Sequence, residues 1–285
     1  MTDLKALKQS GFIPQRQEGL FCLRVKVTGG LVPVDKMLIL ADIAEKYGAG
    51  KLHLTSRQSV EIPFIKRKNI EAVRQRLSEN GLAPADLRPG IRTIAACQGS
   101  EVCQCGLINS QDKAQMLQKR LVDEPERQIP IPHKFKIGIT GCPNNCLKAE
   151  EHDIGLKGAL IPSYNAEDCT HCGLCQKVCP AQAIKVSKTD LTYESDKCIH
   201  CGRCRNKCPE NCWTGQEGIH LYFGGLFGNT IQAGRILGPT VTDDNAIVAI
   251  IQKALSYFET NGRKGERFGR TITRLGWDDF RSYME

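Results

Sequence analysis

The sequence lacks several features that would place the protein in a membrane or on nucleic acid. No stretch of the 285 residues approaches about eighteen uncharged apolar residues, so no membrane-spanning helix is expected. The N-terminus, MTDLKALKQSGF, has neither the apolar run nor the cleavage site of a signal peptide. Basic residues form no long run and do not alternate with aromatic residues, which are 6% of the chain. We therefore expect a cytoplasmic protein that binds no nucleic acid.

Cysteine is the residue in excess, with 15 in the chain. A reducing cytoplasm disfavours disulfides and an odd count fits a disulfide framework poorly, so these thiols predict metal ligation. The formal net charge is +8. If twelve cysteines hold three 4Fe-4S clusters, each contributing about −2 with its thiolates, the net charge falls to roughly +2. Most of the excess positive charge then balances the negative charge of the clusters.

Two segments repeat one cysteine spacing. CTHCGLCQKVCP at 169–180 and CIHCGRCRNKCP at 198–209 both read C-x2-C-x2-C-x3-C-P, which is typical of bacterial ferredoxins. In that pattern the fourth cysteine of each run binds the other cluster. One 4Fe-4S cluster is therefore assigned to Cys169, Cys172, Cys175 and Cys208, and a second to Cys198, Cys201, Cys204 and Cys179. The alternative is a pair of zinc knuckles. Residues 163–215 are predicted to be an inserted electron-transfer domain.

Residues 1–82 predict a compact α+β unit. Strand-like and helical periodicities alternate in the order β-α-β-β-α, which is the order of a ferredoxin-like sandwich with antiparallel pairing. The predicted ranges are a strand at 20–28, a helix at 34–47, strands at 52–56 and 60–65, and a helix at 69–80.

Residues 83–162 and 216–285 would form the second domain. Strands are expected at 91–97 and 134–140, a helix at 111–124 with Ser110 as N-cap, and a proline-interrupted linker at 125–132. Asp243 or Asp244 would cap a helix that ends at Asn261-Gly262, before a mixed helical tail. Because residues i and i+2 of a strand share a face, Lys134 and Lys136 are expected to point the same way.

Two further cysteine pairs carry a resemblance to a known family. Cys97 and Cys103 lie in RTIAACQGSEVC, and Cys142 and Cys146 lie in TGCPNNC. These stretches resemble the cluster site of the siroheme-dependent sulfite and nitrite reductases. The resemblance implies that the four cysteines hold a third 4Fe-4S cluster and that Cys146 also bridges to the siroheme iron. The alternative is four buried small side chains.

The same resemblance implies a cationic substrate site. That family uses two arginines and two lysines to hold a small oxyanion and supply protons. Carried over to this sequence, they are Arg24 in FCLRVKV, Arg92 in GIRTIAAC, and Lys134 and Lys136 in PHKFKIG. LTSRQS resembles the stretch that grips the siroheme carboxylates, which implies contacts from Arg57, Thr55, Gln58 and Ser59; Asn144 is a further match. His53 stands where the family often has another arginine.

The expected fold is therefore an α+β sulfite/nitrite reductase module with an inserted ferredoxin domain, as in the anaerobic and dissimilatory-type branch of that family. Tandem relatives carry two copies of the module, and this chain carries one. We expect a homodimer, or a pair with a homologous subunit, in which the basic residues of one copy face the siroheme held by the other.

The implied activity is six-electron reduction of sulfite to sulfide, with electrons from a separate donor protein or reductase subunit. Nitrite reduction to ammonium and a non-catalytic three-cluster electron-transfer subunit are the alternatives. Cys22, Cys105 and Cys212 fall outside the motifs and are expected to pack as small apolar side chains. His133 and His152 are expected to be structural.

Overall fold

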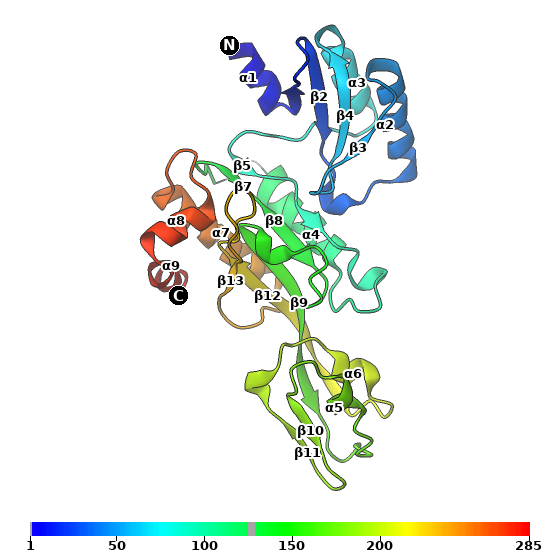
Figure 1. Cartoon of the computed structure of the whole chain (residues 1–285), viewed down its shortest axis with the longest axis vertical. Coiled ribbons are helices and arrows are strands. Elements are labelled where there is room, and N and C mark those ends of the chain that lie inside the picture. The colour runs from blue at the N-terminus through cyan, green and yellow to red at the C-terminus, as the bar shows by residue number, and fades with distance from the viewer. Residues whose placement is uncertain (1, 125–128) are drawn as a thin grey trace.

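The computed structural model describes residues 2–124 and 129–285 and arranges them in three units (Figure 1). The N-terminal unit, drawn in blue and cyan, lies at one end of the long axis. A central unit follows, and a smaller unit around residues 165–212 lies at the other end. No helix in the described ranges is long and apolar enough to span a membrane.

The N-terminal unit is a four-stranded antiparallel sheet with helices packed on it. The strand order is β1-β2-β4-β3, built from β1 (Phe12–Pro14), β2 (Leu20–Val25), β4 (Val60–Lys66) and β3 (His53–Leu54). Helix α1 (Thr2–Gln9) precedes the sheet, and α2 (Val34–Tyr47) and α3 (Ile70–Glu79) follow the predicted order. Burial alternates along β2, so its apolar positions enter a core with Leu40, Ile43 and Val73. This confirms the expected β-α-β-β-α arrangement.

The central unit is a mixed five-stranded sheet of order β13-β12-β9-β8-β6. Its strands are β6 (Ala95–Ala96), β8 (Ile137–Thr140), β9 (Ile154–Tyr164), β12 (Trp213–Phe223) and β13 (Arg235–Ile236). The first three run parallel, whereas β12 is antiparallel to both neighbours. Its helices are α4 (Ser110–Gln118), α7 (Asp244–Asn261), α8 (Phe268–Leu275) and α9 (Trp277–Met284). Phe135, Phe258, Phe268 and Phe280 are fully buried in its core.

The small unit grows from the end of a long hairpin. Strands β9 and β12 pair over all their residues, from Ile154 opposite Phe223 to Tyr164 opposite Trp213. The intervening chain contains α5 (Leu174–Val178), β10 (Ile184–Val186), β11 (Leu191–Tyr193) and α6 (Arg203–Lys207). Ile184, Leu191 and Trp213 form its apolar core together with cysteines. The predicted boundaries of the insertion, 163 and 215, fall inside the two hairpin strands.

Several predicted elements differ in detail. The strand expected at 91–97 is two short strands, β5 (Gly90–Ile91) and β6, and the strand at 134–140 is broken at Lys136 into β7 (Lys134–Phe135) and β8. β5 pairs with β7, whereas β6 pairs with β8 in another sheet. The chain therefore changes sheets at Lys136, which a regular apolar alternation does not reveal.

The predicted N-cap of α4 is wrong by one residue. The side chain of Asn109, not Ser110, accepts from the backbone N–H groups of Gln111 and Asp112. The Ser110 hydroxyl instead donates to the Cys97 carbonyl. The helix also stops at Gln118 and continues as a π-helical turn over Lys119–Asp123. Asp243 caps α7 as expected, through a bond from the Ala246 N–H. Residues 125–128 of the predicted linker lie outside the described ranges.

Candidate active site

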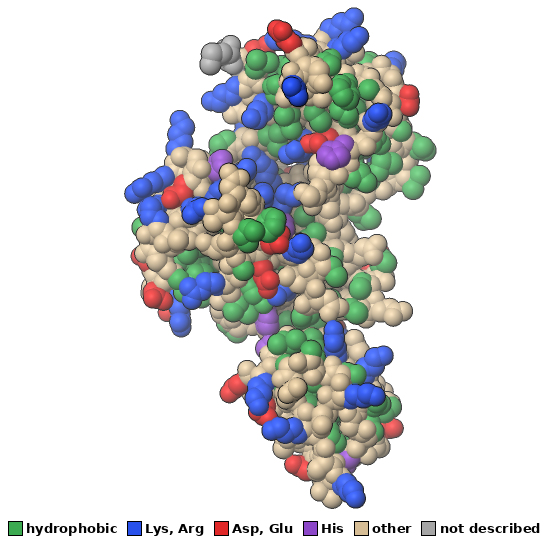
Figure 2. Space-filling model, viewed as in Figure 1, with side chains coloured by type: hydrophobic (Ala, Val, Ile, Leu, Met, Phe, Trp, Pro, Cys, Tyr) green, Lys and Arg blue, Asp and Glu red, His purple; other side chains and the backbone are tan. Residues whose placement is uncertain are grey.

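A cavity of about 210 Å³ opens where the N-terminal unit meets the central unit. Figure 2 shows Lys and Arg side chains gathered over this junction. The cavity is lined by the four predicted catalytic residues and three of the predicted siroheme contacts: Arg24, Arg92, Lys134, Lys136, Arg57, Thr55 and Ser59. Residues far apart in the sequence thus form one strongly cationic site.

Arg24, on β2, is held by an ionic network on the neighbouring strand. Its Nε and Nη2 donate to Glu61 Oε1 at 2.9 and 2.6 Å. The other oxygen of Glu61 lies 2.9 Å from His53 Nδ1. Burial raises the pKa of the Glu61 carboxyl, but the hydrogen bonds from His53 and Arg24 outweigh burial and lower it. His53 therefore supports Arg24 through Glu61.

Arg92 and Arg57 are fixed by backbone carbonyls. Arg92 donates from Nη1 to the Arg88 carbonyl at 2.6 Å and from Nη2 to the Leu87 carbonyl at 3.0 Å. Arg57 donates from Nη2 to the Thr93 carbonyl at 2.9 Å, while its Nη1 is buried without a partner among the described residues. Burial lowers the pKa of Arg57 to about 10. A buried unpaired donor in a cationic cavity is suited to an anionic ligand.

The two lysines have lowered pKa values. Burial is the main cause at each, and neighbouring cations add to it: Arg267 and Arg92 at Lys134, and Arg57 and Arg267 at Lys136. The pKa of Lys136 falls to about 8. In the described part of the chain, neither ammonium donates a hydrogen bond or forms an ion pair. Lys136 can therefore exchange a proton close to neutral pH.

Two buried charged residues in this region were not predicted. Asp153 is fully buried just before β9, and its carboxylate pairs with Arg267, which precedes α8. The sequence carries no motif signal for either residue, because an isolated aspartate or arginine has no characteristic spacing. His152, beside Asp153, is buried and its pKa falls to about 4, mainly through burial, which fits the structural role expected for it.

Gln58 lies in the same loop as Arg57 but has a different task in this structure. Its Nε2 donates to the Ala96 carbonyl at 2.7 Å, and its Oε1 accepts from the Ala96 N–H at 2.9 Å. Both ends of the amide are therefore bound to β6. The loop is thereby fastened to the strand that leads to Cys97.

The central cysteine loops meet beyond the other end of β6 and β8. Cys97 Sγ accepts from the Gly141 N–H at 3.0 Å. Cys142 is buried, and burial together with the thiolates of Cys103, Cys105 and Cys97 raises its pKa. Cys146 is on the same loop as Cys142 and is exposed. The packing expected for Cys105 is wrong: this residue is exposed beside the motif, because the loop turns it outward.

Tight glycine contacts shape these loops. A side chain at Gly141 would come within 2.8 Å of the Gly99 Cα, and one at Gly106 within 2.4 Å of the Ser100 nitrogen. Gly141 thus allows the two cysteine segments to approach closely, whereas Gly106 allows the first segment to fold back on itself.

The basic cavity and the central cysteine loops lie at opposite ends of the same two strands. Lys136 precedes β8 and Cys142 follows it, and Arg92 and Cys97 flank the parallel strand β6 in the same way. From Lys136 to Cys142, an extended chain advances up to about 20 Å at about 3.3 Å per residue. Within one chain, therefore, the two sets are separated by the length of these strands.

The cysteines of the small unit lie in two groups. Cys169, Cys172, Cys175 and Cys208 line one cavity, together with the buried Cys212. Burial, and then the neighbouring Cys201 and Cys198, raise the pKa of Cys204 to about 12. Cys198, Cys204 and Cys179 all raise the pKa of the Tyr193 hydroxyl, after burial. Among the described residues, no three metal-binding side chains converge as they would on one ion. Four cysteine side chains around one cavity fit a 4Fe-4S cluster, which takes four thiolate ligands.

The second cysteine run is the one that contacts the central unit. Arg203 Nη2 lies 3.4 Å from the Asn144 Oδ1, and the Leu160 N–H donates to the His200 carbonyl at 2.9 Å. At Gly202 a side chain would come within 2.9 Å of Leu107. Asn144, predicted as a siroheme contact, thus bonds to the small unit in this structure.

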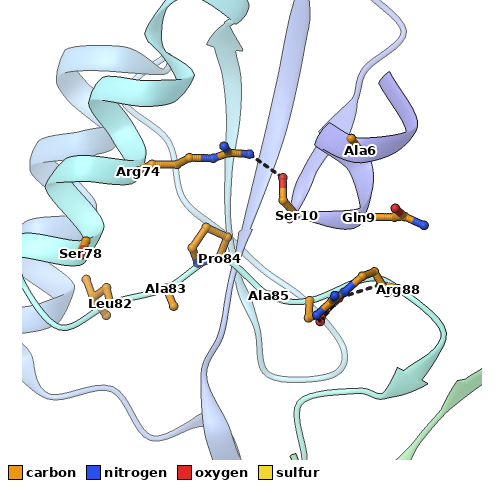
Figure 3. A pocket seen from close by; sticks show the side chains of 11 residues that line it. Ala6, Gln9, Ser10, Arg74, Ser78, Leu82, Ala83, Pro84, Ala85 and Arg88 are labelled. Carbon is orange, nitrogen blue, oxygen red and sulfur yellow. Dashed lines mark hydrogen bonds and ion pairs between the residues drawn. The ribbon is translucent and has the colours of Figure 1, made fainter. Parts of the chain in front are cut away.

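A separate cavity of about 610 Å³ lies between α1, α3 and residues 82–88. Figure 3 shows Arg74 reaching from α3 toward Ser10, and the Nη2 to Oγ distance is 2.6 Å. Ala85 and Asp86 line both this cavity and the basic one, so the chain at 85–86 is the wall between them. None of the predicted site residues lines the larger cavity.

Comparisons with known proteins identify the family of the chain. The family described as "Nitrite and sulphite reductase 4Fe-4S domain" matches residues 88–285, and "Nitrite/Sulfite reductase ferredoxin-like half domain" matches residues 13–80. The structure of dissimilatory sulfite reductase I superposes with a TM-score of 0.76 at 17% identity, covering 93% of this chain and 69% of that one.

The similar sequences include sulfite and nitrite reductases. The coenzyme F420-dependent sulfite reductase of Methanocaldococcus jannaschii is 35% identical over 95% of this chain and 43% of its own length. A subunit of the anaerobic sulfite reductase of Salmonella typhimurium is 30% identical over 64% of this chain and 56% of its own. The ferredoxin–nitrite reductase of Oryza sativa is 32% identical over 53% of this chain and 24% of its own. The chain thus spans only about half or less of the length of these relatives. Because the family model matches most of its residues, the chain belongs to the nitrite and sulphite reductase family.

Proposed function

We propose that the protein reduces sulfite to sulfide in a siroheme-dependent reaction. The observation that carries the proposal is the basic cavity, in which Arg24, Arg57, Arg92, Lys134 and Lys136 converge from two units. A small divalent oxyanion is the ligand such a site suits, because arginine forks hold its oxygens and lysine ammoniums supply protons.

The reaction consumes hydrogensulfite, six electrons and six protons, and yields hydrosulfide and three waters. Siroheme and the 4Fe-4S clusters, when bound, supply the electrons and the iron to which the sulfur of sulfite would bind. The chain supplies the rest. Arg24 and Arg92, held rigidly by Glu61 and by carbonyls, would bind the substrate oxygens. Lys134 and Lys136 would donate protons to the oxygens that leave as water.

Siroheme would be bound by hydrogen-bond donors of this chain. Arg57 lines the cavity with a buried unpaired Nη1, and Thr55 and Ser59 lie beside it, so these residues fit a group that carries eight carboxylates. Cys97, Cys103, Cys142 and Cys146 would hold the third cluster, which would supply electrons to the siroheme. The small unit would hold the other two clusters and receive electrons from a donor protein. Electrons would leave it on the side of the second cysteine run, which contacts the 142–146 loop.

We infer that each complete site combines two copies of the chain. The separation of the basic cavity from the cysteine loops along β8 supports this, because the residues that would bind substrate and those that would hold the third cluster must serve one site. The lysines of one copy would then act together with the partner's Cys146 and the other cluster cysteines of that copy. Alternatively, a homologous protein would take the place of the second copy.

Complementation between inactive variants tests that inference. Lys136→Met and Cys146→Ser are each expected to be inactive as homodimers. In a mixed dimer, sites formed between copies leave one site with both residues intact, so co-expression should restore about one quarter of the wild-type activity at statistical pairing. Sites contained within one copy would restore none, and that result would refute the inference.

Nitrite is the second candidate substrate, since ferredoxin–nitrite reductases are among the relatives. A non-catalytic electron-transfer role is less well supported, because all four predicted catalytic cations line one cavity. The deciding experiment uses anaerobically purified protein, siroheme extraction and reduced viologen, with sulfide and ammonium both assayed. A higher kcat/KM for sulfite with sulfide as product is expected. Preference for nitrite would replace the substrate, and absence of siroheme would overturn the proposal.

A further inference from the structure

Asp153 and Arg267 form a buried ion pair behind the two lysines. Arg267 Nη2 donates to Asp153 Oδ2 at 2.6 Å, and the side chains are 13% and 0% exposed. They come from the start of β9 and the start of α8, more than a hundred residues apart. Neither belongs to the cation set that the family resemblance implies.

The Asp153 carboxylate also holds the backbone of Lys136. The Lys136 N–H donates to Asp153 Oδ2 at 2.8 Å, and the Lys136 carbonyl accepts from the Ile154 N–H at 3.1 Å. Lys136 is the residue at which the chain leaves β7 and enters β8. At this break, both of its backbone polar groups are therefore fixed by residues 153 and 154, and one of the two bonds depends on a side chain.

The pair does not complete its own hydrogen bonds. Asp153 Oδ1 and Arg267 Nε are buried without partners in the described part of the chain. A buried pair with unmet bonds is a weak source of stability, and apolar residues of similar volume often serve a fold as well. Its bond to the backbone of Lys136, which lines the basic cavity, indicates a functional reason.

We propose that Asp153 and Arg267 are positioning residues for the two lysines: Asp153 fixes the Lys136 backbone at the strand break, and Arg267 adds a buried positive charge behind both ammoniums. This rests on the proposed function in so far as the lysines are proton donors. The two members act on the lysines in opposite senses, because one is an anion and the other a cation.

Charged groups face the lysines from every neighbouring element. Arg267 is the strongest charge lowering the pKa of Lys134 and, after Arg57, of Lys136, whereas Asp153 raises the pKa of both. The charged and titratable groups around the two lysines include Arg24, Arg57, Arg92, His133, His152, Asp153 and Arg267, with Asp86 lining the same cavity and Lys134 also acting on Lys136.

The first test measures the lysines directly in the holoenzyme. Trace labelling with acetic anhydride across pH, read by mass spectrometry, gives the pKa of Lys136, with the exposed Lys188 as internal control. Arg267→Gln removes a cation, so the pKa of Lys136 should rise by about one pH unit. Asp153→Asn removes an anion, so it should fall. Arg267→Lys keeps the charge and should restore the wild-type value.

The second test follows sulfite turnover against pH. Turnover needs a charged lysine, so its alkaline limb should move up in Arg267→Gln and down in Asp153→Asn. A merely structural pair would lower the melting temperature in both variants without moving the lysine pKa in opposite directions, and that result would overturn the proposal. If either single variant fails to fold, the double variant Asp153→Asn/Arg267→Gln leaves no unpaired charge; its labelling pKa should lie between the two expectations, and a value outside that interval would overturn the proposal.

The two readouts separate this inference from the proposed function. Opposite shifts in labelling without sulfite or nitrite turnover would support the positioning roles and refute the reductase proposal. Turnover of sulfite with no shift in the labelling pKa would support the reductase proposal and refute the positioning roles.

Discussion

The Lys136 ammonium should destabilise the folded protein, and its removal should stabilise it. The pKa falls from the ordinary 10.5 to about 8, through burial first and then through Arg57 and Arg267. One pH unit corresponds to about 1.4 kcal/mol, so the charged side chain opposes folding by at most about 3 kcal/mol at pH 7. Partial screening by solvent reduces this, and we expect about 1–3 kcal/mol.

Lys136→Met is the matched change, because methionine has a similar length and no charge, and the backbone bond to Asp153 is kept. At about 2 °C per kcal/mol for a chain of this size, the Tm at pH 7 should rise by about 2–6 °C. Sulfite turnover should fall by about 10²-fold or more, since a proton donor is lost. Stability and activity should therefore change in opposite directions.

The pH dependence checks the cause. Below about pH 8 the lysine is charged in both folded and unfolded chains, and the full destabilisation is present. Between pH 8 and 10.5 the folded protein releases this proton while the unfolded chain keeps it, so the difference shrinks and then vanishes. At pH 9.5 the Tm gain should be about half that at pH 7. A lower Tm for Lys136→Met at pH 7, or the same gain in the exposed control Lys188→Met, would refute the reasoning.

Other outcomes are expected from the same geometry. Arg92→Ala should lose most sulfite turnover while the siroheme absorption band survives; loss of the band would assign this residue to cofactor assembly instead. Cys208→Ala and Cys172→Ala should remove the same cluster of the small unit, leaving the same two sets of cluster signals by electron paramagnetic resonance; different surviving sets in the two variants would contradict the crossover. Gln58→Ala should lower the Tm, because two bonds to Ala96 worth about 1–2 kcal/mol together are lost. Turnover of the wild type should decline above about pH 8, as Lys136 loses its proton, and a flat profile to pH 10 would exclude it as the donor.

Local patterns predicted the elements whose signals are local. The periodicity of residues 34–47, the Asp243 cap and the repeated cysteine spacing each lie within a few turns of chain, and α2, α7 and the cysteine grouping follow them. The family resemblance then selected cations that meet in one cavity, although nothing in the spacing of Arg24 and Lys134 shows that they do.

What sequence reasoning missed depends on contacts between distant segments. The strand break at Lys136 arises because a carboxylate from residue 153 takes the N–H that a regular ladder would use. Arg267 reaches the site because the residue after it, Phe268 at the start of α8, packs on Phe135 of β7. Asn109 displaced Ser110 as cap because the serine hydroxyl is drawn to the Cys97 carbonyl. In each case a contact between distant segments overrides the conformation that the local sequence favours.

The hairpin of β9 and β12 attaches the small unit to the central sheet at a single place. Tyr164 and Trp213 are register partners, and their rings pack at 4.9 Å, so the chain enters and leaves the small unit at adjacent points. A module attached in this way can be lost, replaced or added without changing the strand order of the sheet that carries it. The central sheet and the small unit are thus separable parts, and a chain with a short turn in place of residues 165–212 would keep the basic cavity. If the proposed function holds, such a chain would depend on an external donor that reaches the 142–146 loop.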